Sequence, residues 1–119
     1  MSQTKIIQER IGEADRSFSA LHIEMKNAGI TFLSEGEDRL GTLVVSIPQR
    51  HELIGPPISS VLIGDRNITV ARALAERLAE RTKKIALISV FIRSLQEKEA
   101  GPLLLELVEK VMKKKESQE

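Results

Sequence analysis

The chain has 119 residues, the size of one ordinary domain, so we expect a single domain over residues 1–115 and a frayed charged tail over residues 116–119. Its 18 basic and 17 acidic residues give a formal net charge of +1, which argues against a nucleic-acid binder and against attachment to an anionic membrane. The sequence has no cysteine, no apolar run long enough to span a bilayer and no signal-like start, a combination that favours a cytoplasmic protein without disulfides.

The first half of the chain has the pattern of antiparallel strands. Apolar and polar residues alternate from Ser17 to Lys26, where an Asn-Ala-Gly turn predicts a hairpin with a return strand at Ile30 to Glu35. A further strand at Gly41 to Ile47 would complete a meander of three antiparallel strands, and Lys5 to Ile11 predicts a short strand before them. Within this meander we interpret His22 as a surface or edge histidine, because it lies opposite the face that carries leucine and isoleucine.

The middle of the chain predicts a loop, a strand and a helix. Prolines bound the loop from Pro48 to Pro57, and the apolar run Val61 to Ile63 ends a buried strand at the Gly64-Asp65 turn. A helix follows, capped by Asp65 or Asn67. Its apolar residues recur at the spacing of one helical face: Ala71, Leu74, Ala75, Leu78 and Ala79.

The rest of the chain predicts one more strand and one more helix. The nearly continuous apolar run from Ile85 to Ile92 is typical of a central strand covered on both faces. Ser94 to Glu97 matches a capping box, but Gly101-Pro102 favours a helix that starts at Pro102 and runs to Lys114. These elements predict a two-layer α+β fold, with an antiparallel sheet of about six strands and two main helices on one of its faces.

Such a sheet would expose apolar side chains on the face that the helices leave open. A second subunit packed on that face is the simplest way to cover them, so we expect a dimer formed through the sheet. The candidate interface residues come from three of the predicted strands: Leu43, Val45, Val61, Ile88 and Val90.

One segment carries a family resemblance. The turn Leu62-Ile63-Gly64-Asp65 precedes a helix with Leu74-Ala75-Glu76-Arg77-Leu78-Ala79, and Arg81-Thr82-Lys83-Lys84 leads into the next strand. In this order, and most clearly from Ile58 to Ser89, the sequence resembles the proteasome assembly chaperone 4 family. The resemblance implies an α+β subunit that dimerises, with itself or with a paralogous chaperone subunit, and helps proteasome α-subunits assemble into the 20S core particle.

The resemblance also implies a protein without cofactor or turnover, so we expect no enzyme and no small-molecule substrate. Some proteasome assembly factors dock through a terminal hydrophobic-Tyr-x motif, and the chain has no tyrosine to form one. Any α-subunit would then bind to the folded domain.

The candidate partner-binding residues lie at the two ends of the predicted long helix, and each group has a simpler interpretation. Asp65, Arg66 and Asn67 could contact a partner or an anion, but a turn with a helix cap explains them as well, and they lack the glycine pattern of a nucleotide site. Arg81 and Lys84 could form a docking patch or simply a solvated helix end.

The residues themselves leave other functions open. Two histidines without neighbouring cysteine or aspartate clusters predict no metal site, and no serine has a local partner that would activate it. A generic dimeric interaction scaffold and a small nucleic-acid-binding dimer remain the alternatives to the chaperone. The second would need a basic stripe with stacking aromatic residues, and the chain has only three phenylalanines and no tryptophan or tyrosine.

Overall fold

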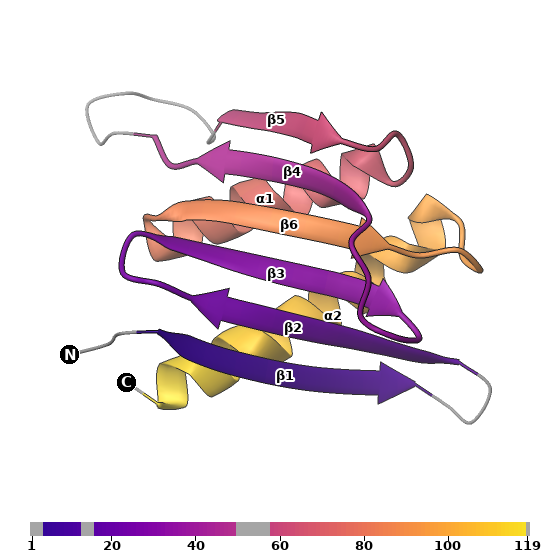
Figure 1. The fold of residues 1–119 in the computed structure, drawn as a ribbon, viewed down its shortest axis with the longest axis horizontal. Helices are drawn as coiled ribbons and strands as arrows, with labels where there is room; N and C mark the ends of the chain where they lie inside the picture. The colour runs from indigo at the N-terminus through magenta and orange to yellow at the C-terminus, as the bar shows by residue number, and fades with distance from the viewer. Residues whose placement is uncertain (1–3, 13–15, 50–57, 119) are drawn as a thin grey trace.

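A computed structural model describes residues 4–12, 16–49 and 58–118, and most of the Pro48 to Pro57 loop therefore lies outside the described residues. Figure 1 shows two helices behind one face of a single sheet. The elements in chain order are β1 (Lys5–Gly12), β2 (Ser17–Glu24), β3 (Ala28–Glu35), β4 (Thr42–Ile47), β5 (Ile58–Ile63), α1 (Ile68–Thr82), β6 (Ile85–Phe91) and α2 (Glu97–Ser117). The α+β class, the six strands and the placement of both helices on one face are confirmed.

The order of the strands differs from the predicted meander. The sheet runs β1-β2-β3-β6-β4-β5, so β6 separates β3 from β4, and it pairs parallel with β3 and antiparallel with β4. The sheet is therefore mixed, and the prediction of a purely antiparallel sheet is wrong at the β3–β6 pair. The physical reason is burial, since the most continuously apolar strand takes a central place between two strands, with α1 over one of its faces.

The two helices bury one face of the sheet. α1 packs on β4, β5 and β6, and α2 packs on β1 and β2. The predicted stripe of α1 is buried, with Ala71, Ala75 and Ala79 completely inaccessible, so these small side chains let the helix backbone approach the strands. α2 contributes Leu104 and Leu107, both 0% exposed, and burial of each such leucine stabilises the fold by about 1.5–3 kcal/mol.

The second helix starts earlier than predicted. Gln96 is its N-cap, and a capping box joins the Gln96 and Glu99 side chains to each other's backbone N–H groups. Pro102 therefore lies inside α2 rather than at its first position, and its side chain is exposed. The local capping hydrogen bonds offset the intrahelical hydrogen bond that proline cannot form.

His22 is buried, which corrects its interpretation as a surface or edge residue. The face of β2 that carries it is the one that α2 covers, and only 2% of the residue is exposed. His22 Nε2 lies 2.8 Å from Glu24 Oε1 and Nδ1 lies 2.7 Å from Thr31 Oγ1. Because an ionised carboxylate only accepts hydrogen bonds, Nε2–H donates to Glu24 and Nδ1 accepts from the Thr31 hydroxyl.

The charge of Glu24 is balanced by two lysines. Lys84 Nζ donates to Glu24 Oε2, and Lys115 Nζ from α2 lies 3.8 Å from the same oxygen. Burial opposes ionisation of Glu24, but the hydrogen bonds from Lys84 and His22 outweigh it, so the pKa of this carboxyl falls below its ordinary value. The His22 cluster (His22, Glu24, Thr31, Lys84 and Lys115) thus ties the sheet to the end of α2.

Candidate interaction surfaces

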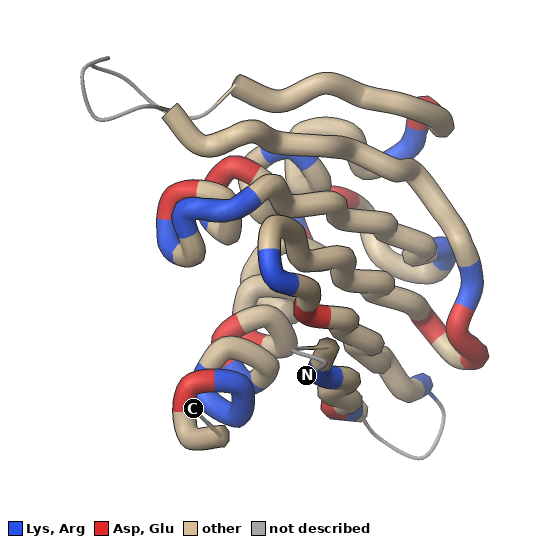
Figure 2. Tube along the Cα trace, turned by 60° about the vertical axis from the view of Figure 1, so that its left-hand side comes forward, with Lys and Arg blue, Asp and Glu red and all other residues tan. Residues whose placement is uncertain are grey.

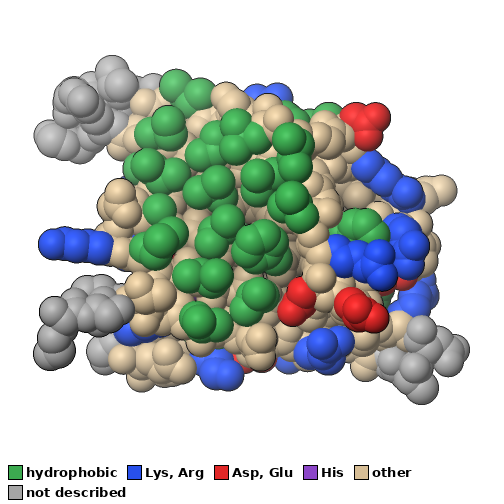
Figure 3. Space-filling view, viewed as in Figure 1, with side chains coloured by type: hydrophobic (Ala, Val, Ile, Leu, Met, Phe, Trp, Pro, Cys, Tyr) green, Lys and Arg blue, Asp and Glu red, His purple; other side chains and the backbone are tan. Residues whose placement is uncertain are grey.

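The face of the sheet opposite the helices is apolar, and neither helix of the described residues lies over it. Residues on this face alternate with the buried residues of the other face; Leu21, for example, lies between Ala20 and His22. Figure 3 shows this side of the molecule, with hydrophobic side chains gathered over the middle of the sheet and charged ones around its margin. We call it the open sheet face and define it by Leu21, Ile23, Ile30, Phe32, Leu43, Val45 and Leu87.

Cross-strand pairs make this face continuous. Leu21 is opposite Phe32 on the neighbouring strand, and Val45 is opposite Leu87. Aromatic and aliphatic pairs of this kind pack against each other along a sheet. Further large apolar side chains extend the surface toward the β5 edge, where Ile47 is 57% and Ile58 is 65% exposed.

The connection from β3 to β4 crosses in front of one end of the open sheet face, as Figure 1 shows. The Ser34 hydroxyl donates to the Arg39 carbonyl oxygen, Gly41 N–H donates to Ser89 Oγ, and both serines are completely buried. Gly41 is required there because a Cβ atom would come within 2.1 Å of the Val90 carbonyl oxygen. The exposed part of the open sheet face therefore begins beyond this connection.

The structure divides the five candidate interface residues between two environments. Leu43 and Val45 lie on the open sheet face, whereas Val61 pairs with Val44 on the helix side of the edge strand β5 and is 36% exposed. Ile88 and Val90 face the helices instead and are 0% and 2% exposed. As a candidate interface residue of β6 we therefore take Leu87 in place of Ile88 and Val90, because the Leu87 side chain lies on the open sheet face opposite Val45.

The candidate partner-binding residues also divide into two groups, at opposite ends of α1. Arg81 belongs to an ion-pair network with α2, in which its Nη1 donates to Glu109 Oε1 at 2.8 Å and its Nη2 lies 3.2 Å from Glu116 Oε2. The Arg81 guanidinium keeps the pKa of Glu109 below its ordinary value. Figure 2 shows charges of both signs interleaved along the helices at this end. Lys84 is engaged by Glu24, so both cations of this group have carboxylate partners inside the chain.

The second group borders a groove at the other end of α1. Its volume is about 390 Å³. Three segments line the groove: the end of the β3–β4 connection with the start of β4, the β5–α1 turn, and the end of β6. Most of the accessible lining is apolar. We call it the arginine groove and define it by Leu40, Ile63, Arg66, Phe91 and Arg93, with Arg39 beside it.

Backbone geometry fixes the shape of the arginine groove. Gly64 has a φ of +93°, and a Cβ atom there would come within 2.6 Å of Thr42 Oγ1. The Thr42 hydroxyl donates to the Arg66 carbonyl oxygen, and Asn67 takes a left-handed conformation at the N-cap of α1. Asn67 makes no side-chain cap hydrogen bond; its amide nitrogen donates to the Ile92 carbonyl oxygen at 3.4 Å. The turn is thus fastened to the ends of β4 and β6.

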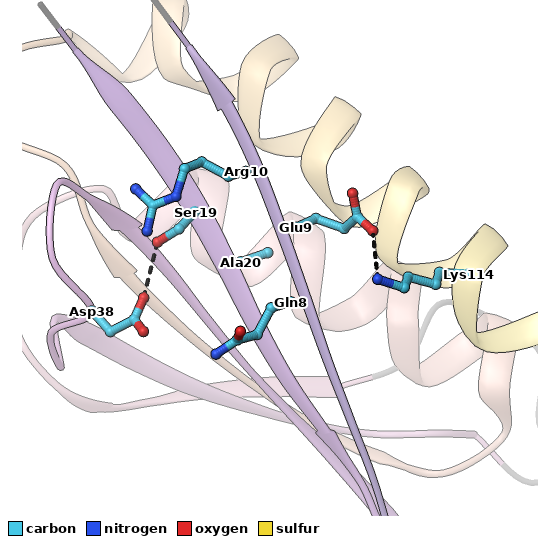
Figure 4. Close-up of a pocket in the computed structure, with 7 residues that line it drawn as sticks. All are labelled: Gln8, Glu9, Arg10, Ser19, Ala20, Asp38 and Lys114. Atoms are coloured by element: carbon cyan, nitrogen blue, oxygen red, sulfur yellow. Dashed lines mark hydrogen bonds and ion pairs between the residues drawn. The ribbon is translucent and has the colours of Figure 1, made fainter.

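A hollow near the β1–β2 edge, shown in Figure 4, does not form one site. Its lining residues point to two sides of the strands, with Glu9 directed toward α2 and Gln8 and Arg10 directed away from it. Polar groups on both sides already have partners: Ser19 donates to Asp38 at 2.9 Å, and Lys114 lies 3.5 Å from Glu9. We assign it no binding role.

Two further observations concern the described part of the chain. No helix there is long and apolar enough to cross a membrane. No three histidine, cysteine, aspartate or glutamate residues gather within it as metal ligands would.

Sequence patterns indicated part of these surfaces and missed the rest. Arg66 and Asn67 were recognisable from the turn before α1, whereas Arg39, Phe91 and Arg93 come from distant segments that only the strand order brings together. The glycine at position 64 was the one local signal that the turn must bend sharply.

Comparison with known proteins gives one family and one fold. The family model described as proteasome assembly chaperone 4 matches residues 18–92. A chain from the crystal structure of a chaperone complex for yeast 20S proteasome assembly superposes with a TM-score of 0.68 over 96% of each chain, at 14% sequence identity. At that identity the likeness is one of fold. No curated protein sequence matches the chain.

Proposed function

Because this chain belongs to the proteasome assembly chaperone 4 family, we propose that it acts as a dimeric, non-catalytic chaperone that helps proteasome α-subunits assemble. Family membership implies a non-enzymatic role. The partner in the dimer would be a second copy of the chain or a paralogous chaperone subunit. The fold that the chain shares with a component of a yeast proteasome assembly complex also supports this role.

The open sheet face is the observation that carries this proposal. Along β2, β3, β4 and β6 no charged side chain points to this side, and the residues there are mainly leucine, isoleucine, valine and phenylalanine. A contiguous apolar patch is costly in water, at about 25 cal/mol for each Å² exposed, and such patches mark protein interfaces. A chaperone that acts by association needs such a surface and needs no catalytic centre.

Co-purification with free α-subunits tests the function directly. The chain would be mixed with separately expressed α-subunits and, in parallel, with sealed 20S particles, and each mixture would be resolved by size-exclusion chromatography with light scattering. We expect a complex with free α-subunits, because assembly factors act before the ring is closed. No complex at tens of micromolar protein would remove the proposal, while the variants described in the Discussion would still report on the dimer.

A further inference from the structure

The arginine groove carries three arginines that no carboxylate neutralises within the described part of the chain. No carboxylate among the described residues forms an ion pair with Arg39, Arg66 or Arg93. By contrast, Arg77 and Arg81 pair with carboxylates of α2. Three guanidinium groups at one end of the sheet therefore lack a carboxylate partner, and of these only Arg66 forms a side-chain hydrogen bond within the described residues, from its Nη2 to the Arg93 carbonyl oxygen at 2.9 Å.

The arginines are arranged around an aromatic ring. The guanidinium carbons of Arg39 and Arg93 lie 5.5 Å and 5.4 Å from the Phe91 ring centroid, within the range of a cation–π contact. Stacking of this kind positions a guanidinium group and leaves its N–H donors free for a carboxylate. Figure 3 shows Lys and Arg side chains against a small hydrophobic patch at the end of the sheet toward which β6 points.

The acidic groups nearest the arginine groove do not neutralise it. Glu35 accepts hydrogen bonds from the backbone N–H groups of Arg93 and Ser94, both at 2.9 Å, and is occupied by them. Asp65 lines the groove without forming an ion pair among the described residues. At the start of α1, the Val70 N–H donates to Glu97 Oε2 at 2.7 Å. The guanidinium groups of Arg39 and Arg93 thus keep their N–H donors without a hydrogen-bond partner among the described residues, and Arg66 uses one of its own for the Arg93 carbonyl oxygen.

From this arrangement we infer that the arginine groove binds an extended acidic segment of a partner protein, in which aspartate or glutamate alternates with apolar residues. The carboxylates would meet Arg39, Arg66 and Arg93, and the apolar side chains would pack on Leu40, Ile63 and Phe91. A nucleic acid is disfavoured, because Phe91 is the only aromatic residue of the groove and the mostly apolar lining offers no continuous basic track. The inference holds whether or not the partner is a proteasome subunit.

A peptide titration tests it on the intact chain. The probe is a capped pentapeptide that alternates acidic residues with leucine, added to ¹⁵N-labelled protein and followed by amide chemical shifts. We expect saturable shifts at Leu40, Gly41, Asp65 and Arg93, and a weaker affinity at higher salt. The same peptide with asparagine and glutamine in place of its acidic residues should bind at least about tenfold more weakly, a loss of about 1.4 kcal/mol.

Variants assign the binding to the arginines. Arg39→Gln and Arg93→Gln should each weaken binding of the acidic peptide by about tenfold, because each loses a charge-assisted hydrogen bond. Both side chains stack on Phe91 and form no ion pair or side-chain hydrogen bond among the described residues, so these variants should fold, which circular dichroism would verify. Lys110→Gln, on the exposed side of α2, removes the same charge elsewhere and should leave binding unchanged.

Several results would overturn the inference. These are equal binding of the acidic and amide peptides, unchanged affinity in both arginine variants, and shifts that map outside the groove. Inorganic phosphate or a short single-stranded DNA that binds the same amides more tightly than the peptide would also overturn it, because the groove would then be a simple anion or nucleic-acid site.

Discussion

A histidine surrounded by charged groups in a protein interior makes stability depend on pH. Burial lowers the pKa of His22 below its ordinary value of 6.5, and the hydrogen bond and negative charge of Glu24 only partly oppose this effect. Lys115 and Lys84 face the same cluster and further disfavour a charged imidazole. The folded state therefore holds His22 neutral under conditions in which the unfolded chain would bind a proton.

The sign of the pH effect follows from the lowered pKa. Above about pH 7.5 His22 is neutral in both states and does not affect stability, but as the pH falls through 6.5 the unfolded chain takes up a proton that the folded chain resists. We therefore expect the free energy of unfolding to decrease from about pH 7.5 to about pH 5.5. Glu24 affects the pH dependence of stability only at lower pH, because the pKa of its carboxyl in the folded state lies below 4.5.

The check is urea unfolding of His22→Gln across this pH range. Glutamine can keep a donor toward Glu24 and an acceptor toward Thr31 but cannot titrate, so the decrease should be smaller than in the unmodified chain. His51→Gln, which changes the other histidine of the sequence, should retain the full decrease. A decrease that persists in His22→Gln and vanishes in His51→Gln would contradict this account.

On the scale of single elements, α2 contains a residue that does not suit a helix. Pro102 removes one backbone donor from the second turn and crowds the carbonyl group four residues earlier. Pro102→Ala should restore that hydrogen bond at an exposed position and raise the free energy of unfolding by about 1–3 kcal/mol. Thermal and urea unfolding would measure the change.

The matched control for Pro102→Ala is Lys110→Ala, at another exposed position of the same helix. It replaces one good helix former with another, so it should change stability by less than about 0.5 kcal/mol. A proline variant that is less stable than the unmodified chain would mean that Pro102 itself has a role in starting α2.

The elements also show what local sequence patterns can predict. Alternation and turn residues predicted the strands, and the 3.6-residue stripe predicted α1, because those signals are local. The position of β6 is not local: it depends on pairing with β3 and β4, which no periodicity encodes. The face of Ile88 was hidden for a related reason, since the run from Ile85 to Ile92 is apolar on both sides and has no alternation to assign.

The candidate site was predictable to the same extent. His22 was placed on the correct side of β2, but which side the helices cover depends on where α2 packs. Likewise, Arg66 was found from its turn, while Arg39 and Arg93 join it only through the order of the strands. Residues adjacent in sequence were therefore identified, and the partners brought by distant segments were not.

For the whole molecule, the two helices bury one face of the sheet, and among the described residues only the β3–β4 connection crosses part of the other. A dimer formed through the open sheet face would bury apolar side chains from the four central strands. Its center would lie near Val45 and Leu87, which are opposite each other in β4 and β6. The arginine groove lies at the end of this sheet, where a partner segment would approach from a different direction.

A negative charge introduced into the open sheet face tests the dimer. Val45→Glu or Leu87→Glu would place a carboxylate without a partner in the proposed interface, so each should weaken dimerisation by about a hundredfold or more and give monomers in light scattering. Both side chains are partly exposed in the single chain, so the fold should survive, as circular dichroism would show. Thr69→Glu adds the same charge on the exposed side of α1 and should stay dimeric, with a melting temperature that still rises with protein concentration. An unmodified chain that is monomeric at every concentration, or an unchanged mass in both sheet variants, would mean that the open sheet face does not hold two subunits together.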